Sequence, residues 1–360
     1  MGANLNVTNI LKDCVEKNAS DIFIIAGARL MYKIDGKIAP QSEAPLMPDD
    51  TEEIVRQIFA CAKDRDQAAF RRDMADDFSF SVPKLGRFRV NTYFQRGSQA
   101  AVLRYVRFNL PDYRNLGIPD IVMELAAKKR GLCLVTGPAG TGKSTTLSSI
   151  VDRINSTRME HIVTIEDPIE YLHSHKQSIV SQIEVNSDVP SYVQGLKSSL
   201  RQSPNVILLG ELRDLDTISI AMTAAETGQL VLSTLHTLGT SNTIDRIVDV
   251  FPPSQQQQIR VQLSMVLEAV VTQQLVPRAD GRGVVPAFEV LLVNTAIRNM
   301  IRDSKIFMID NVIYASASEG MISMDVSLYN LCADGVISKE TAIMHSFNKD
   351  VLSKKLGNIE

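Results

Sequence analysis

The sequence predicts an α/β protein, and two observations lead to that prediction. From Gly131 onward, short apolar segments alternate with stretches of helical periodicity, which is typical of a parallel sheet with helices on both faces. The apolar segments are residues 131–136, 161–166, 205–210 and 229–234. With 360 residues, 44% hydrophobic and 22% charged, the chain has room for about two globular domains and is not disordered as a whole.

Residues 1–108 are predicted to form the first α/β domain. Its expected helices span 7–18 and 50–62, with Asp50 as the N-cap of the second. Its expected strands span 22–27, 30–40 and 78–108, with turns at Asp35-Gly36, Gly86 and Gly97. The last of these segments is a strand meander that is rich in arginine.

A linker and a second domain are expected to follow. Residues 109–120 contain two prolines and one glycine, so we expect the linker there. Residues 121–360 are assigned to the second domain, which opens with an expected helix over 121–129 and continues with the alternating strands and helices. From about residue 253 the pattern indicates mostly helices.

The composition excludes several classes of protein. The net charge is −3, Trp is absent and no basic segment is interleaved with aromatic residues, which argues against direct nucleic-acid binding. The four cysteines are far apart and form no CxxC pair, so we expect neither a zinc site nor a disulfide framework. No signal peptide and no 18-residue apolar run is present, which excludes a membrane span but not docking onto a membrane protein.

The segment from Gly137 to Ser144 matches the pattern GxxxxGK[ST] in full, between an apolar strand and a helical stretch. In this context the pattern identifies a loop whose backbone N–H groups and helix dipole bind phosphates. Lys143 is expected to reach the β and γ phosphates and Ser144 to ligate Mg²⁺, so ATP and Mg²⁺ are the expected cofactors. The expected nucleotide contacts are Gly137, Pro138, Ala139, Gly140, Thr141, Gly142, Lys143, Ser144 and Thr145.

Three further apolar strands are each followed by a residue type that suits phosphoryl chemistry. They carry Glu166, Glu211 and His236, and the carboxyl ends of parallel strands converge on one crevice. A carboxylate there can orient the attacking water or hold magnesium, and a histidine can sense the γ-phosphate. We expect Glu211 to be a metal ligand as well. For either acid, the alternative is a helix N-cap or a solvated loop.

Taken together, these segments resemble the secretion and pilus motor ATPases, and most of all the PilT-type retraction ATPases of type IV pili. Residues 164–171 (TIEDPIEY) look like their Asp box, 200–218 like their atypical Walker B region, and 230–252 like their His box. The N-terminal NASDIFIIAG and YKIDGKI and the C-terminal AIRNMIRD also fit.

The resemblance implies a PAS-like N-terminal domain, a RecA-like ATPase domain and a homohexameric ring with ATP bound between the two domains. The chain would be a Mg²⁺-dependent ATPase that powers pilus retraction and twitching motility. It would drive pilin disassembly through an inner-membrane platform protein, from the cytoplasm at the inner face of the membrane. Arg89 and Arg104 match the family's arginine pair, which would stabilise charge on the phosphates. Their alternative is a solvated face of a strand, and Arg96 and Arg107 are weaker candidates.

Three other functions compete with retraction. A pilus-extension or type II secretion ATPase is the nearest alternative, but many of those carry a tetracysteine zinc insertion and lack a helix like AIRNMIRD. The composition disfavours a RecA-like nucleic-acid translocase. The intact Lys143, Glu166 and Glu211 disfavour a non-hydrolysing scaffold.

The segment Ala296–Asp303 predicts a helix that begins at Asn294-Thr295. Ile297, Met300 and Ile301 share one face and are expected to pack in the core. Arg298 and Arg302 fall on another face, which is either solvated or couples the ATPase core to a partner or to motion of the ring.

Overall fold

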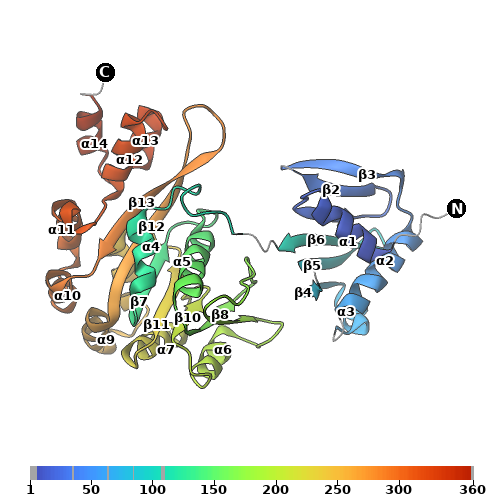
Figure 1. Cartoon of the computed structure of the whole chain (residues 1–360), viewed down its shortest axis with the longest axis horizontal. Coiled ribbons are helices and arrows are strands. Elements are labelled where there is room, and N and C mark those ends of the chain that lie inside the picture. The colour runs from blue at the N-terminus through green and yellow to red at the C-terminus, as the bar shows by residue number, and fades with distance from the viewer. Residues whose placement is uncertain (1–5, 35, 63–64, 84, 107–109, 358–360) are drawn as a thin grey trace. The chain divides into compact units, whose positions relative to one another are not determined.

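The computed structural model describes residues 6–34, 36–62, 65–83, 85–106 and 110–357. Its contacts divide the chain into two units, one comprising Met1–Asn109 with Glu170–Leu172 and the other Leu110–Ile169 with His173–Glu360. Figure 1 labels the helices and strands of both. No helix in these described ranges is long and apolar enough to cross a membrane.

The first unit contains a six-stranded antiparallel sheet with helices packed on one face (Figure 1). The strand order is β3-β2-β1-β6-β5-β4. The strands are β1 (Asp21–Ile24), β2 (Arg29–Ile34), β3 (Lys37–Pro45), β4 (Ala75–Val82), β5 (Gly86–Gln95) and β6 (Ser98–Val106). The helices are α1 (Val7–Glu16), α2 (Pro48–Cys61) and α3 (Gln67–Asp73). Ile22, Phe88 and Leu103 are fully buried in the core that the helices cover.

Two details of this unit differ from the sequence expectations. Asp50 is not the N-cap of its helix, because α2 begins two residues earlier at Pro48, where a missing N–H is tolerated. The Asp50 carboxylate instead accepts a hydrogen bond from the Met47 N–H at 2.8 Å. The short helix α3 was not predicted, whereas the arginine-rich meander is confirmed as β4, β5 and β6.

The second unit is built on a seven-stranded sheet in the order β13-β12-β7-β11-β10-β8-β9. All neighbouring pairs are parallel except the edge pair β12–β13. The strands are β7 (Gly131–Thr136), β8 (His161–Glu166), β9 (Ile179–Glu184), β10 (Val206–Leu209), β11 (Leu230–Leu235), β12 (Leu267–Pro277) and β13 (Val284–Leu292).

Helices cover both faces of this sheet, as the alternating pattern predicts. They are α4 (Asp120–Met123), α5 (Lys143–Thr157), α6 (Tyr192–Ser199), α7 (Leu215–Glu226), α8 (Thr240–Asp249) and α9 (Pro253–Val266). The C-terminal helices are α10 (Thr295–Arg302), α11 (Ile309–Ala315), α12 (Met324–Ala333), α13 (Lys339–His345) and α14 (Lys349–Leu356). Along β7, Leu132 and Leu134 pack into one core cluster and Cys133 and Val135 into the other, so the strand is buried on both faces.

The expectation of mostly helices after residue 253 is confirmed, but two strands in this region were not predicted. The strands β12 and β13 form a long antiparallel hairpin there that extends the sheet beside β7. Both strands are largely buried, so their apolar residues do not alternate with polar ones, and periodicity cannot distinguish such a strand from a buried helix. The helix expected over 121–129 is a short α-helix that continues as a 3₁₀ turn at Glu124–Ala127.

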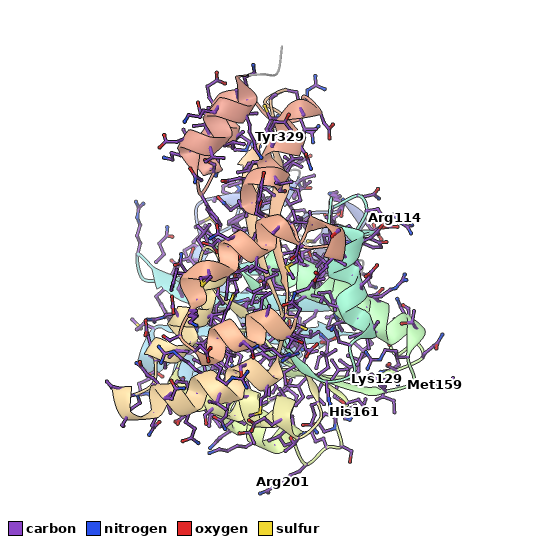
Figure 2. The ribbon with its side chains drawn as sticks, turned by 90° about the vertical axis from the view of Figure 1, so that its left-hand side faces the viewer. Arg114, Lys129, Met159, His161, Arg201 and Tyr329 are labelled. Atoms are coloured by element: carbon purple, nitrogen blue, oxygen red, sulfur yellow. The ribbon has the colours of Figure 1, made fainter. Side chains whose placement is uncertain are left out.

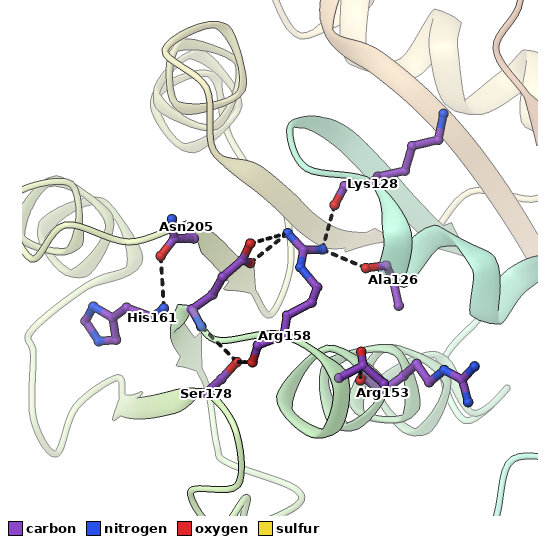
Figure 3. Close-up of polar contacts among 9 residues, drawn as sticks. Ala126, Lys128, Arg153, Arg158, His161, Ser178 and Asn205 are labelled. Atoms are coloured by element: carbon purple, nitrogen blue, oxygen red, sulfur yellow. Dashed lines mark hydrogen bonds and ion pairs between the residues drawn. The ribbon is translucent and has the colours of Figure 1, made fainter.

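Arg158 ties together three segments at the amino end of the sheet (Figure 3). Its Nη1 donates to the carbonyl oxygens of Ala126 and Lys128 at 2.6 and 2.7 Å, and its Nη2 donates to Glu160 at 2.8 Å. Because Arg158 directly follows α5, these bonds fix the far end of the helix whose first turn carries the phosphate-binding loop.

Replacing Arg158 by Ala should lower the free energy of unfolding by about 2–4 kcal/mol, because two carbonyls and a carboxylate lose their donor in a poorly solvated place. Arg153→Ala is the matched control, since that exposed arginine lies in the same helix (Figure 3) and should change stability by no more than about 0.5 kcal/mol. Equal losses for the two variants in urea unfolding would contradict this role.

Candidate functional site

The predicted phosphate-binding loop connects β7 to α5, and its backbone requires glycine. Gly137 and Gly142 have φ of 140° and 86°, in the region that side chains disfavour. A Cβ on Gly137 would lie 2.2 Å from the carbonyl oxygen of Gln273, so no larger residue fits. Gly142 is the N-cap of α5, so the unpaired N–H groups of the first helical turn lie at the loop.

Lys143 lies within the loop. Its Nζ donates to the carbonyl oxygens of Gly137 and Pro138, both at 2.8 Å, and its side chain is buried. The other predicted nucleotide contacts are Ser144 and Thr145 in the first turn of α5, the buried Thr141, and the exposed Pro138, Ala139 and Gly140. The geometry therefore combines an ammonium group, glycine backbone and a helix N-terminus in one loop, which is the arrangement that binds phosphates.

Strand β12 packs against the loop and the first turn of α5, a contact that the sequence pattern does not predict. Gln273 of β12 accepts a hydrogen bond from the Thr146 hydroxyl at 2.8 Å. The hydroxyls of Thr136 and Thr272 also lie 2.9 Å apart, at the last paired position of β7 and β12. Gln273 stands 127 residues from Thr146, so no local sequence signal could have joined them.

Glu211 and His236, predicted separately from two strands, are in contact. The Nε2 atom of His236 lies 3.1 Å from one carboxylate oxygen of Glu211, and Arg213 forms an ion pair with the other. Most of the Glu211 side chain is buried. The hydrogen bond that the Arg213 guanidinium donates to Glu211 raises the pKa of Arg213, so this guanidinium stays charged. Both carboxylate oxygens of Glu211 are thus held in place by nitrogen groups.

Arg213 was not among the predicted site residues. It stands two positions after Glu211, in the segment that joins β10 to α7. A charged residue in such a connection is usually solvated, so only the contact itself reveals its part in the site.

Glu166 ends β8, on the other side of β10 from His236. One of its oxygens accepts a hydrogen bond from the Thr164 hydroxyl at 2.7 Å and a longer one from the Gln182 amide at 3.4 Å. The register of β8 with β10 places Ile165 opposite Leu209, so Glu166 and Glu211 both lie at the carboxyl ends of these neighbouring strands. Glu166 is a buried acid with neutral donors and is not a solvated loop residue.

Tyr192 of α6 adds a phenol to this group of acids. Burial raises its pKa, and the negative charges of Asp167, Glu211 and Glu166 raise it further. A Cβ on Gly210 would lie 2.8 Å from the Tyr192 hydroxyl oxygen, which explains why glycine precedes Glu211. Tyr192 was also missed, because nothing in the sequence pattern separates a tyrosine near the start of a helix from a packing residue.

The predicted arginine pair lies in the first unit. Arg89 on β5 and Arg104 on β6 are directly opposite each other, so their side chains share one face of the sheet. Asp77 pairs with Arg89 at 3.2 Å and the buried Asp21 pairs with Arg104 at 2.9 Å, which offsets the repulsion between the two cations. Two thirds of the Arg104 side chain remains exposed. Arg96 lies in the turn between these strands, and Arg107 is outside the described residues.

No group of three or more His, Cys, Asp or Glu side chains in the described part of the chain is arranged to hold a metal ion. Mg²⁺ bound with phosphates takes only one or two protein ligands and completes its shell with water and phosphate oxygens. The predicted ligands Ser144 and Glu211 therefore stay a prediction.

The helix predicted at Ala296–Asp303 is confirmed as α10, which begins after an Asn294 N-cap. Ile297 and Ile301 are fully buried and Met300 partly so. Arg298 is not a solvated residue: its guanidinium pairs with Glu268 at 2.6 Å and donates to the carbonyls of Ser264 and Met265. It thus anchors α10 to the end of α9 and the start of β12.

Comparison with known proteins adds independent evidence. Residues 3–307 match the family described as type II/IV secretion system protein. The type IV pilus retraction ATPase PilT of Pseudomonas aeruginosa is 40% identical over 338 residues, which cover 94% of this chain and 97% of that protein. A twitching motility protein of Neisseria gonorrhoeae is 39% identical over 97% of this chain and 92% of its own length.

A solved structure is also similar. The crystal structure of the pilus retraction motor PilT with bound ADP superimposes with a TM-score of 0.87 at 43% identity, and covers 98% of this chain and 100% of its own.

The close approach of Gly210 to Tyr192 gives a test of the local packing. Gly210→Ala should lower the free energy of unfolding by about 1–3 kcal/mol, because the new methyl group meets the Tyr192 hydroxyl. The double variant Gly210→Ala/Tyr192→Phe removes the obstructing oxygen and should recover most of that loss. Strictly additive effects in a double-mutant cycle would show that the two residues do not meet.

Proposed function

The chain belongs to the family of type II/IV secretion system proteins, and on that premise we propose that it is an ATP-hydrolysing motor that powers type IV pilus retraction. The observation that carries the proposal is the phosphate-binding loop of Gly137 to Ser144 beside the paired Glu211 and His236, in a chain that matches a retraction ATPase over 94% of its length.

The loop binds the β and γ phosphates of ATP. Its N–H groups and the first turn of α5 supply hydrogen bonds, and Lys143 exchanges two carbonyl oxygens for phosphate oxygens. The hydrogen bond from Thr146 to Gln273 holds the first turn of α5 against β12 when Lys143 moves.

Mg²⁺ fits the donors that the site offers. The Ser144 hydroxyl stands in the first turn of α5, and carboxylates stand at the strand ends, which are the oxygen donors that Mg²⁺ prefers. When bound, the ion neutralises charge that develops on the phosphate oxygens. Glu211 and the Ser144 hydroxyl would be the residues that hold the ion.

Glu211 is the proposed activator of the attacking water. His236 and Arg213 hold its two oxygens, so the carboxylate is oriented before ATP arrives and becomes available when those partners shift toward the γ-phosphate. Glu166 is a second carboxylate at the same edge, held by Thr164 and Gln182, and contributes to positioning water or metal.

The finer parts of the proposal concern assembly. We expect a homohexameric ring in the cytoplasm, attached at the inner face of the membrane to an inner-membrane platform protein. In that ring Arg89 and Arg104 serve the phosphates, which is supported by their shared face and by the exposure of Arg104.

Variants of the site test the ATPase assignment. Lys143→Ala should abolish ATP turnover and weaken ATP binding. Glu211→Gln keeps the shape and removes the charge, so binding should survive while turnover falls by orders of magnitude. Steady-state phosphate release and nucleotide binding by fluorescence measure both effects. Near-normal turnover in the Lys143→Ala variant would reject the assignment.

The arginine pair gives a second test. Arg104→Ala should reduce turnover by about 10³-fold or more if the guanidinium stabilises the transition state. Arg72→Ala, an exposed arginine in the same unit, is the matched control and should leave turnover unchanged. Light scattering in the presence of a non-hydrolysable nucleotide checks that each variant still forms the ring. Unchanged turnover by an assembled Arg104→Ala protein would reduce the pair to surface residues.

A further inference from the structure

A cavity of about 760 Å³ lies in the C-terminal part of the chain, among β13, α11, α12 and α14. Tyr329, one of its lining residues, stands among these helices in Figure 2. None of the residues of the phosphate-binding loop lines it. Its volume is in the range of about 300–1,000 Å³ that is usual for ligand-binding pockets.

Three carboxylates line the cavity, and each is bound only by uncharged donors. These are Glu289, which is almost fully buried on β13, Asp310 of α11 and Asp325 of α12. The Thr240 N–H donates to Glu289 at 2.8 Å, and the Ser241 hydroxyl donates to Asp310 at 2.5 Å. The N–H groups of Phe347 and Asn348 donate to Asp325 at 2.8 and 3.0 Å. Within the described residues, none of the three acids forms an ion pair. Burial raises the pKa of Glu289 to about 7, and the negative charge of Asp310 contributes to that rise.

The mouth of the cavity is apolar and uncovered. Tyr314 and Val351 face it from α11 and α14 and are 58% and 46% exposed, and Phe347 is exposed to a similar degree. One cation is already present: the Lys355 ammonium donates to the Tyr314 hydroxyl at 2.9 Å and lies 4.9 Å from the centre of its ring. Two aspartates, Asp310 and Asp325, against one lysine leave an excess of negative charge behind the aromatic rim, and Glu289 adds to it when ionised.

We propose that this cavity is a docking site for a segment of a partner protein that inserts a lysine or arginine side chain flanked by apolar residues. The inserted cation pairs with carboxylates that have no counter-ion, and its apolar neighbours cover the exposed rim. A neutral or acidic segment lacks the first interaction, and a free polyamine lacks the second.

The cavity is joined to the nucleotide side of the unit through α8. Glu289 and Asp310 hold the first two residues of that helix, Thr240 and Ser241, which follow His236 by only four and five positions. A cation that draws on the same carboxylates therefore acts on the first turn of α8 and on the loop that carries His236.

The test uses the full chain and a fluorescein-labelled peptide with the sequence Ser-Gly-Phe-Lys-Leu-Arg-Phe-Gly-Ser, followed by fluorescence anisotropy. The wild type should bind this peptide, and a counterpart with Glu at both basic positions should bind at least about tenfold more weakly. Val351→Lys places a cation in the mouth and should weaken binding by about tenfold or more. Lys355→Gln removes the resident cation and should strengthen it.

Met344→Lys is the matched control, because it adds the same charge at an exposed apolar residue outside the cavity and should leave binding unchanged. Thermal unfolding checks that each variant is folded, and Tyr314→Lys replaces Val351→Lys if the latter is not. The proposal is overturned if the wild type fails to bind the basic peptide or binds the acidic peptide equally tightly. It is also overturned if Met344→Lys weakens binding as much as Val351→Lys, or if Lys355→Gln weakens binding. Because binding is measured without ATP, the result is independent of whether the chain drives retraction.

Discussion

The parallel ladder of β8, β10, β11 and β7 is the constraint on which the site depends. These strands are buried on both faces, so their backbone groups have no water to bind and each must pair with its neighbour. The ladder continues past the strand ends, where Gly137 N donates to Leu235 O at 3.2 Å and Gly210 N donates to Ile165 O at 2.8 Å. The first residue of the phosphate-binding loop and the residue before Glu211 are therefore held by one backbone network.

Strand β12 extends that network toward the C-terminal part of the chain. Near its start, Glu268 forms ion pairs with both Lys128 and Arg298, and further along, Gln273 supports the phosphate-binding loop. A single strand thus connects the ion pair that holds α10 to the site where phosphates are proposed to bind.

Much of this site could be predicted because its signals are local. The glycine pattern of Gly137 to Ser144, the acids at strand ends and the N-cap of α10 each lie within a few residues of the element that they define. Arg213, Tyr192 and Gln273 could not be predicted in the same way, since each acquires its place through tertiary contacts. The same holds for β12, whose burial on both faces removes the alternation that marks a strand, and for Asp50, where Pro48 moved the start of the helix.

The most direct measurement of the central claim is imaging of fluorescently labelled pili in living cells that carry Glu211→Gln in place of the native gene. ATP hydrolysis at Glu211 is proposed to supply the energy for retraction, not for extension. Pili in these cells should therefore still extend but rarely retract, while wild-type cells do both. Retraction at the normal frequency and speed in the Glu211→Gln cells would contradict this proposal.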